Sequence, residues 1–438
     1  MGANPSKRDP EERITINSWT EAFSEEERQA LRGRWEGICK RANAPSKDTL
    51  PVADFKRYCT FMPVTLRENF LALIRPPSST SPMTSRSFYS GARQLFHVQS
   101  FSLTASLYSF GSLSTHSLGG YVDILVHHVF PRSKPADRAR LVEYILLSGK
   151  RQSGEMESSE EEEEAWLGQC RIPGRTSAST FTEWFERSGP FRDLASQALS
   201  IMFFNAPHPS TPDSSSFILE PTDIWAIRNA LPSSCTIFRP LYIPEAGRSW
   251  FSFRDALTLS GSTLILIRDT KNYAFGAFAF TDWERKPDFY GDPEAFLFTL
   301  QPKLRIYKDQ GYNDHRQYLN YDSKTLPNGL GMGGQLEFFG LWLEAGLDKG
   351  KSCAEPLSST FGSPCLASSK EFILHDIEAW CVRESERERV DPRVGTAAEL
   401  NPDAVNLLEM SGRRMYGKEV READANQTAP STQRDQTT

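Results

Sequence analysis

The hydrophobic pattern changes its period near residue 217. Before this point apolar residues recur at helical spacing, so that Leu31, Trp35 and Ile38 share one face of a helix expected over 24–41. After it, short alternating runs separated by turn residues predict strands. The change predicts an α+β protein, with a helical first half followed by an antiparallel β-sandwich.

The helical domain is expected over 19–205, after a polar leader at 1–18. Ser24 is a suitable N-cap for the first helix, and Glu27 would complete a capping box. The apolar pattern predicts further helices at 52–61, 65–74, 121–129, 138–147, 181–185 and 194–204. One more helix is expected at 223–230, at the start of the domain that follows.

Two polar stretches interrupt this pattern. Residues 76–87 are rich in proline and serine, which is typical of a loop. Glu155 to Glu164 is an acidic low-complexity run, and it predicts a solvated, flexible insert at 152–165.

The sandwich is expected over 217–383. The alternating runs predict strands at 262–268, 273–280, 295–300, 304–307, 337–343 and 372–382. The strand at 273–280 has apolar or small residues on both faces, so we expect it to be central and buried on both sides. Two prolines weaken the stretch 238–249, which suggests an edge strand.

The tail, 384–438, is polar except for a predicted helix at 401–412. Asn401 is a good N-cap, Pro402 occupies the first helical position and Gly412 is a natural stop. Its apolar stripe consists of Val405, Leu407 and Leu408. A helix this short is unstable alone, so we expect it to dock on a partner.

The first residues match the N-myristoylation pattern, with Gly2 as the acceptor and Ser6 in the Ser/Thr position. An ordinary disordered start is the alternative. One acyl chain gives only weak, reversible membrane attachment, so a second contact would be needed. The sequence has neither a secretory signal nor an apolar run long enough to span a bilayer.

The net charge and the spacing of the cysteines limit the kinds of ligand that the chain is expected to bind. The net charge of -6 gives no general reason to expect nucleic-acid binding. The seven cysteines form no C-x-x-C pair and no zinc-finger spacing, which predicts reduced thiols in the cytosol and no metal or cofactor. The helix pairs at the N-terminus are arranged as in an EF-hand but lack its calcium-binding loop.

The segment Gly311-Tyr312-Asn313-Asp314-His315 offers candidate chemistry. Asp314 and His315 could form an acid–base pair, but neighbours on a loop rarely face each other, and no nucleophile can be assigned beside them. We expect these side chains to bond the backbone of their own loop. The isolated acids Glu220, Asp223 and Glu378 are interpreted as surface or cap residues.

A second segment, 329–334, contains a literal G-x-G-x-x-G. A dinucleotide site would need a strand before it and a helix after it, whereas here a strand-like aromatic run follows. The preferred interpretation is a tightly folded structural glycine loop against the sheet, formed by Gly329, Gly331, Gly333 and Gly334.

These motifs occur in the same order in a known protein family. Residues 217–382, with 311–315, 329–334, Phe339-Gly340-Leu341-Trp342 and Ile377-Glu378-Ala379-Trp380, resemble the TLDc family throughout. The resemblance implies a β-sandwich without an established active site. It also implies association with the V-type ATPase through its peripheral catalytic sector.

The family members most similar to this chain are myristoylated, reside on lysosomes and support mTOR signalling. They carry an EF-hand-like N-terminal domain and a C-terminal helix that reaches the ATPase stalk. The resemblance therefore implies a non-enzymatic adaptor in the cytoplasm, attached peripherally to lysosomal or other endomembranes. The residues expected to bind the partner are Tyr312, Asn313, Asp314, His315, Val405, Leu407 and Leu408. The alternative is oxidative-stress protection, which would need an exposed thiol of low pKa.

Overall fold

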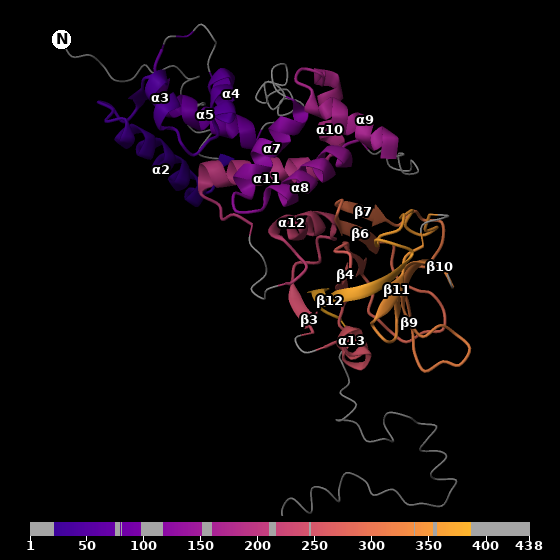
Figure 1. Ribbon diagram of the computed structural model, residues 1–438. Coiled ribbons are helices and arrows are strands. Elements are labelled where there is room, and N and C mark those ends of the chain that lie inside the picture. The colour runs from indigo at the N-terminus through magenta and orange to yellow at the C-terminus, as the bar shows by residue number, and fades with distance from the viewer. Residues whose placement is uncertain are drawn as a thin grey trace, which may run out of the picture. The chain divides into compact units, whose positions relative to one another are not determined.

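The computed structural model describes residues 22–74, 79, 81–97, 117–150, 160–209, 216–244, 247–336, 338–353 and 357–386. The described residues up to Ser385 belong to one compact unit, drawn in Figure 1. Gly2, the leader, and the predicted helix 401–412 with Val405, Leu407 and Leu408 lie outside the described residues. Within the described part, no helix combines the length and the apolar character needed to cross a bilayer.

The first helix, α2 (Glu25–Arg41), begins as its sequence predicts. The Ser24 hydroxyl accepts a hydrogen bond from the Glu27 backbone N–H at 3.2 Å, and the Glu27 carboxylate accepts one from the Ser24 N–H at 2.8 Å. The reciprocal bonds satisfy two backbone donors that a helix start leaves free. Leu31, Trp35 and Ile38 lie buried on one face, so both the cap and the apolar face are confirmed.

The N-terminal helices form two helix–loop–helix pairs. The first consists of α2, β1 (Thr49–Leu50) and α3 (Val52–Tyr58), and the second of α4 (Val64–Ile74), β2 (Met83–Thr84) and α5 (Ser85–His97). The two short strands pair antiparallel and tie the loops together. The predicted loop at 76–87 is wrong from residue 83 onward.

The polar residues around Thr84 and Ser87 mark the start of helix α5. The Ser87 N–H donates to the Thr84 hydroxyl, and the Thr84 N–H donates to the Ser87 hydroxyl, both at 3.0 Å. Small hydroxyl side chains cap helices as readily as they form loops, so composition alone did not distinguish the two.

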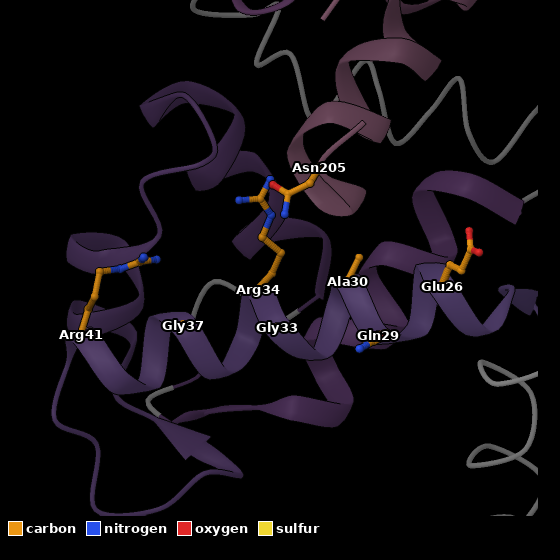
Figure 2. A pocket seen from close by; sticks show the side chains of 8 residues that line it. All are labelled: Glu26, Gln29, Ala30, Gly33, Arg34, Gly37, Arg41 and Asn205. Carbon is orange, nitrogen blue, oxygen red and sulfur yellow. The ribbon is translucent and has the colours of Figure 1, made fainter. Parts of the chain in front are cut away.

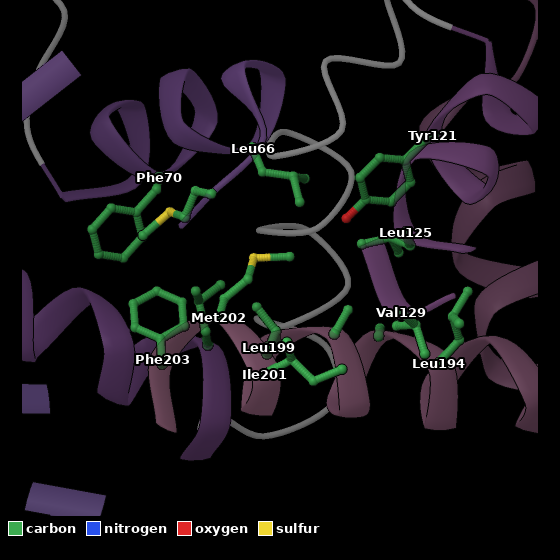
Figure 3. Packing of buried hydrophobic residues seen from close by; sticks show 14 of the residues in the cluster. Leu66, Phe70, Tyr121, Leu125, Val129, Leu194, Leu199, Ile201, Met202 and Phe203 are labelled. Carbon is green, nitrogen blue, oxygen red and sulfur yellow. The ribbon is translucent and has the colours of Figure 1, made fainter. Parts of the chain in front are cut away.

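The second helical group shares a core with the first. It contains α7 (Leu118–Val129), α8 (Pro135–Ser148), α9 (Glu160–Arg171), α10 (Ala178–Arg187) and α11 (Gly189–Phe204). Figure 3 shows Leu66 and Phe70 of α4 on one side and Tyr121 and Leu125 of α7 on the other, above apolar side chains of α11. Helix α11 therefore joins the two groups.

The acidic run is not a flexible insert along its whole length. Residues 160–165 form the first half of α9, with four glutamates in its first turn. Negative charge is favourable there because the N-terminus of a helix carries a partial positive charge. The prediction is therefore wrong for this part of 152–165, while 151–159 lie outside the described residues.

The second half of the chain is an antiparallel sheet, which confirms the expected α+β class. Its strands are β3 (Arg239–Tyr242), β4 (Ser262–Asp269), β5 (Ala274–Ala279), β6 (Phe296–Gln301), β7 (Arg305–Lys308), β8 (Tyr318–Asn320), β9 (Gly329–Gln335), β10 (Phe338–Glu344), β11 (Lys349–Lys351) and β12 (Glu371–Arg383). They are hydrogen-bonded in the order β7-β6-β5-β4-β12-β11-β10-β9-β8. The strand β3 pairs with β12, and no other partner of β3 is seen among the described residues.

The path of strands folds into two layers because β12 pairs with β4 along one part and with β11 along another. Alternate residues of β5 face opposite cores. Phe275 and Ala277 lie in the core shared with β9 and β10, whereas Ala274 and Phe278 lie in the core under α12 (Pro221–Ala230). The prediction of a central strand buried on both sides is confirmed.

Charged side chains join the helical region to the sheet region. Arg140 of α8 lies 2.7 Å from Asp137 and 3.6 Å from Asp223 of α12, and it also donates to the Leu300 carbonyl of β6. Arg305 of β7 donates to Glu163 of α9 at 2.9 Å. We call these two groups the charged joint. Both arginines are almost fully buried, so the joint is part of the folded core.

Candidate partner-binding surface

The loop between β7 and β8 is organised by Asn313. Its side-chain oxygen accepts hydrogen bonds from the His315 backbone N–H at 3.0 Å and from the Thr360 hydroxyl at 2.8 Å, and its amide donates to Ser359 at 3.2 Å. Thr360 in turn accepts from the Gly334 N–H at 2.9 Å. Asn313 and Thr360 together therefore link three segments that are distant in sequence.

Asp314 and His315 point to different partners. The Asp314 carboxylate accepts from Arg316 at 2.7 Å, while His315 Nδ1 lies 2.6 Å from the Gly334 carbonyl and its ring stacks on Phe289 at 4.5 Å between centroids. The two side chains do not bond each other in this arrangement. The geometry suits a loop held in place more than an acid–base pair.

Arg316 secures the base of the same loop. Its guanidinium donates to the Asp309 carboxylate at 2.9 Å as well as to Asp314, and the Arg316 and Asp309 side chains are only 8% and 5% exposed. A pair this deeply buried, with several hydrogen bonds, holds its geometry well. The loop tip therefore stands on a rigid base.

The predicted glycine loop is wrong, because residues 329–335 form strand β9 inside the sheet. A Cβ on Gly329 would come within 2.2 Å of the Leu343 carbonyl, and one on Gly331 within 2.5 Å of the Phe339 ring. Gly333 and Gly334 have φ angles of +71° and +84°, in the left-handed region. Glycine is needed here because the backbone and aromatic rings of β10 pack directly on the strand.

Three exposed apolar side chains lie on the linked segments. Tyr312 is 73% exposed, Leu336 at the β9–β10 turn is 42% exposed, and Leu357 beside Ser359 is 38% exposed. We call these three residues the Tyr312 surface. Aromatic and aliphatic side chains on a rigid, hydrogen-bonded frame are typical of protein-binding surfaces.

The acids Asp223 and Glu378, interpreted from the sequence as surface or cap residues, are buried. Glu378 accepts hydrogen bonds from the Ser216 hydroxyl at 2.6 Å, the Phe217 N–H at 2.7 Å and the Trp380 indole at 3.0 Å. It thereby fastens the segment that enters the sheet region. The sequence signal for this role was the position of Glu378 within the apolar motif Ile377-Glu378-Ala379-Trp380.

Asp223 combines a cap with a buried charge. Its carboxylate accepts from the Glu220 N–H at 3.2 Å, which completes a capping box at the start of α12. Burial raises the pKa of Asp223 to about 7, while the Arg140 guanidinium opposes this shift. The two predicted cap roles at Glu220 and Asp223 are therefore present, but Asp223 is inside the charged joint.

The cysteines do not favour peroxide chemistry. All seven are free thiols, and six of them are buried. Burial raises the pKa of every one, to about 12 for Cys59 and Cys170. A reactive thiol needs the opposite shift, so direct peroxide consumption has no suitable nucleophile here.

A shallow hollow runs along α2, between Glu26 and Arg41 (Figure 2). Its middle is lined by Gly33 and Gly37 and by Arg34, whose side chain lies beside Asn205. Arg34 donates to the Ile201 carbonyl at 3.0 Å and so serves the packing of α2 on α11. In the described part of the chain, no cluster of three or more His, Cys, Asp or Glu could hold a metal ion.

The comparison with protein families agrees with this architecture. The model of the TLDc domain matches residues 212–383, which include the sheet, the Asn313 loop and Glu378. Residues 212–383 of the chain are therefore a TLDc domain.

The chain is also similar to the mTOR-associated protein MEAK7. The mouse (Mus musculus) and human (Homo sapiens) proteins are 39% and 38% identical to it over 176 residues, which cover 40% of this chain and 39% of each relative. Nuclear receptor coactivator 7 of chicken (Gallus gallus) is 35% identical over 128 residues, 29% of this chain and 13% of that protein. The chain thus matches about two fifths of the length of the MEAK7 relatives.

Proposed function

We propose that this chain is a non-enzymatic peripheral membrane adaptor that binds the V-type ATPase through its TLDc domain and supports mTOR signalling at lysosomes. The Tyr312 surface carries the proposal, because three exposed apolar side chains stand on loops fixed by Asn313 and Arg316. The name of the similar MEAK7 proteins associates them with mTOR, which supports the same pathway for this chain.

The mode of attachment is part of the proposal. Gly2 would carry a myristoyl group, and the segment 401–412 would dock on the partner through Val405, Leu407 and Leu408. A single acyl chain binds membranes weakly, so the Tyr312 surface would supply the second contact. The adaptor would then occupy the cytoplasmic side of lysosomal or other endomembranes.

The helical region is proposed to be EF-hand-like without binding calcium. Two helix–loop–helix pairs joined by β1 and β2, with Thr49 opposite Thr84 and Leu50 opposite Met83, support this arrangement. The described part of the first loop, 42–51, carries a single acid, Asp48, where a calcium site needs several oxygen ligands. Titration calorimetry with calcium should give no heat of binding; micromolar binding would contradict this part.

Affinity purification of the full chain from detergent-free membranes tests the proposal. Wild type should recover ATPase peripheral subunits, and Gly2→Ala should move the protein from membranes to the soluble fraction. The double variant Leu336→Ser, Leu357→Ser should lose the subunits and should also attach to membranes more weakly than wild type, because only the acyl chain then holds it there. Recovery of the same subunits with this double variant would contradict the role of the Tyr312 surface.

Deletion of 401–412 tests the tail separately. The proposal expects weaker recovery of the subunits, because the short helix gains its stability only by docking. A substitution of Ile373, which is 55% exposed on β12, serves as the control for removing an exposed apolar side chain elsewhere. If the deletion behaves as wild type, the tail has no part in binding.

A further inference from the structure

A second group of surface side chains lies at the other end of β8 from the Asn313 loop. Arg254 of α13 (Trp250–Leu257) lies 5.0 Å from the ring centroid of Phe251 and 4.0 Å from that of Tyr321. Arg285 lies 4.8 Å from the same Tyr321 ring. We call Phe251, Arg254, Tyr321 and Arg285 the arginine ladder. Rings and guanidinium groups alternate along it.

The ladder is fixed before any partner binds. Ser249 caps α13 by accepting from the Ser252 N–H at 3.3 Å, which positions Phe251 and Arg254. The Tyr321 N–H donates to the Asn320 side chain at 3.0 Å, and Tyr321 packs against the core of the sheet. Stacked side chains lose less conformational entropy on binding than free ones.

The charge of the ladder is incompletely balanced. Among the described residues, the acid paired with its guanidinium groups is Asp322, whose carboxylate lies 3.8 Å from Arg254 and whose side chain is 77% exposed. An exposed pair at this distance contributes little, so both arginines keep donors for another carboxylate. Phe251, 65% exposed, adds an apolar contact at the end of the ladder.

We propose that the arginine ladder is a docking surface for an acidic segment of a partner protein, in which carboxylates meet Arg254 and Arg285 and an adjacent apolar side chain covers Phe251. Guanidinium groups bind carboxylates bidentately, and aromatic residues and arginines dominate the energy of protein interfaces. This surface goes beyond the ATPase proposal, which rests on other residues.

A protein segment fits better than a membrane. Acids lie among the cations of this region: Asp322 beside Arg254, and Glu284 paired with Lys286 at 3.2 Å. A flat anionic lipid surface would meet these acids together with the arginines, whereas a peptide can place each carboxylate individually.

Fluorescence anisotropy tests the proposal with a short fluorescein-labelled peptide in which pairs of glutamates alternate with leucine. Wild type should bind it, and binding should weaken with added salt. The double variant Arg254→Gln, Arg285→Gln should bind at least about tenfold more weakly, because two charge-assisted contacts are lost. Phe251→Ala should weaken binding without changing its salt dependence.

The control is Arg171→Gln, Arg239→Gln, which removes two exposed arginines that pair with acids on other parts of the chain. It should bind as wild type. If the Gln double variant fails to fold, Arg254→Lys, Arg285→Lys keeps the charge and should still lose affinity, since lysine cannot form the bidentate contact.

Three results would overturn the proposal. One is no binding of the peptide by wild type, and another is an equal loss in the control variant. The third is tight binding of phosphatidylserine vesicles that depends on Arg254 and Arg285 while the glutamate peptide stays free. That result would assign the ladder to lipid headgroups.

Discussion

The sheet region meets its surroundings in two opposite ways. At the charged joint, Arg140 and Arg305 form buried ion pairs where the sheet region contacts the helices of the same chain. At the Tyr312 surface, exposed apolar side chains stand on loops held by hydrogen bonds. Charges suit the joint because burying them fixes one geometry. Apolar groups suit the surface because they contribute little to folding and are available to a partner.

The largest loss of stability is expected when the charged joint loses the guanidinium group of Arg140. Arg140→Met would leave Asp137 and Asp223 buried without their shared partner, and we expect it to lower the free energy of unfolding by about 3–5 kcal/mol. Urea denaturation measures the change. The exposed pair of Arg171 and Glu143 provides the control, since Arg171→Met should cost at most about 1 kcal/mol. Equal costs would remove the distinction between buried and exposed charges.

A slightly smaller effect is expected in the strand that supports the Tyr312 surface. Gly331→Ala places a Cβ within 2.5 Å of the Phe339 ring, so we expect a loss of about 3 kcal/mol in the free energy of unfolding. Gly346→Ala is the matched control, because its Cβ would meet Asp348 at an ordinary 3.5 Å. Full stability of the Gly331 variant would show that β9 does not need a glycine there.

The pH dependence of stability tests whether Asp223 of the charged joint is as deeply buried as the structure indicates. Burial raises the pKa of Asp223 to about 7 in the folded protein, above the ordinary value of 3.8. Between these values the folded protein binds a proton that the unfolded chain releases, so this group makes stability fall as pH rises from about 4 to about 7. Asp223→Asn should remove that part of the slope.

Urea unfolding of both proteins across this pH range measures the difference between their slopes. Parallel curves for wild type and Asp223→Asn would show that Asp223 is ionised throughout the range.

The sequence predicted the elements whose signals are local. Ser24 and Glu27 mark a helix start within four residues. Strand β5 has apolar or small residues at every position, and these residues alone predict that both of its faces are buried. The glycine strand β9 could not be recognised in this way. Its burial comes from Phe339 and Trp342, which lie on a neighbouring strand and fill the space that side chains of β9 would occupy.

Partners distant in sequence also explain why the roles of Glu163 and Glu378 were predicted wrongly. Glu163 belongs to an acidic run that is typical of a solvated segment, and its partner Arg305 is 142 residues away. Glu378 bonds Phe217, 161 residues earlier in the chain. Of the proposed site, the motif 311–315 was visible in the sequence. Leu336 and Leu357 were not, because only folding brings their segments beside Tyr312.

The central claim is that the Tyr312 surface serves binding and not folding. Biolayer interferometry with the purified peripheral sector of the V-type ATPase, paired with urea unfolding of the same samples, tests it directly for Tyr312→Ala. We predict binding weaker by at least about tenfold, with a change in unfolding free energy within about 0.5 kcal/mol. Wild-type affinity in a fully folded Tyr312→Ala protein would contradict the account.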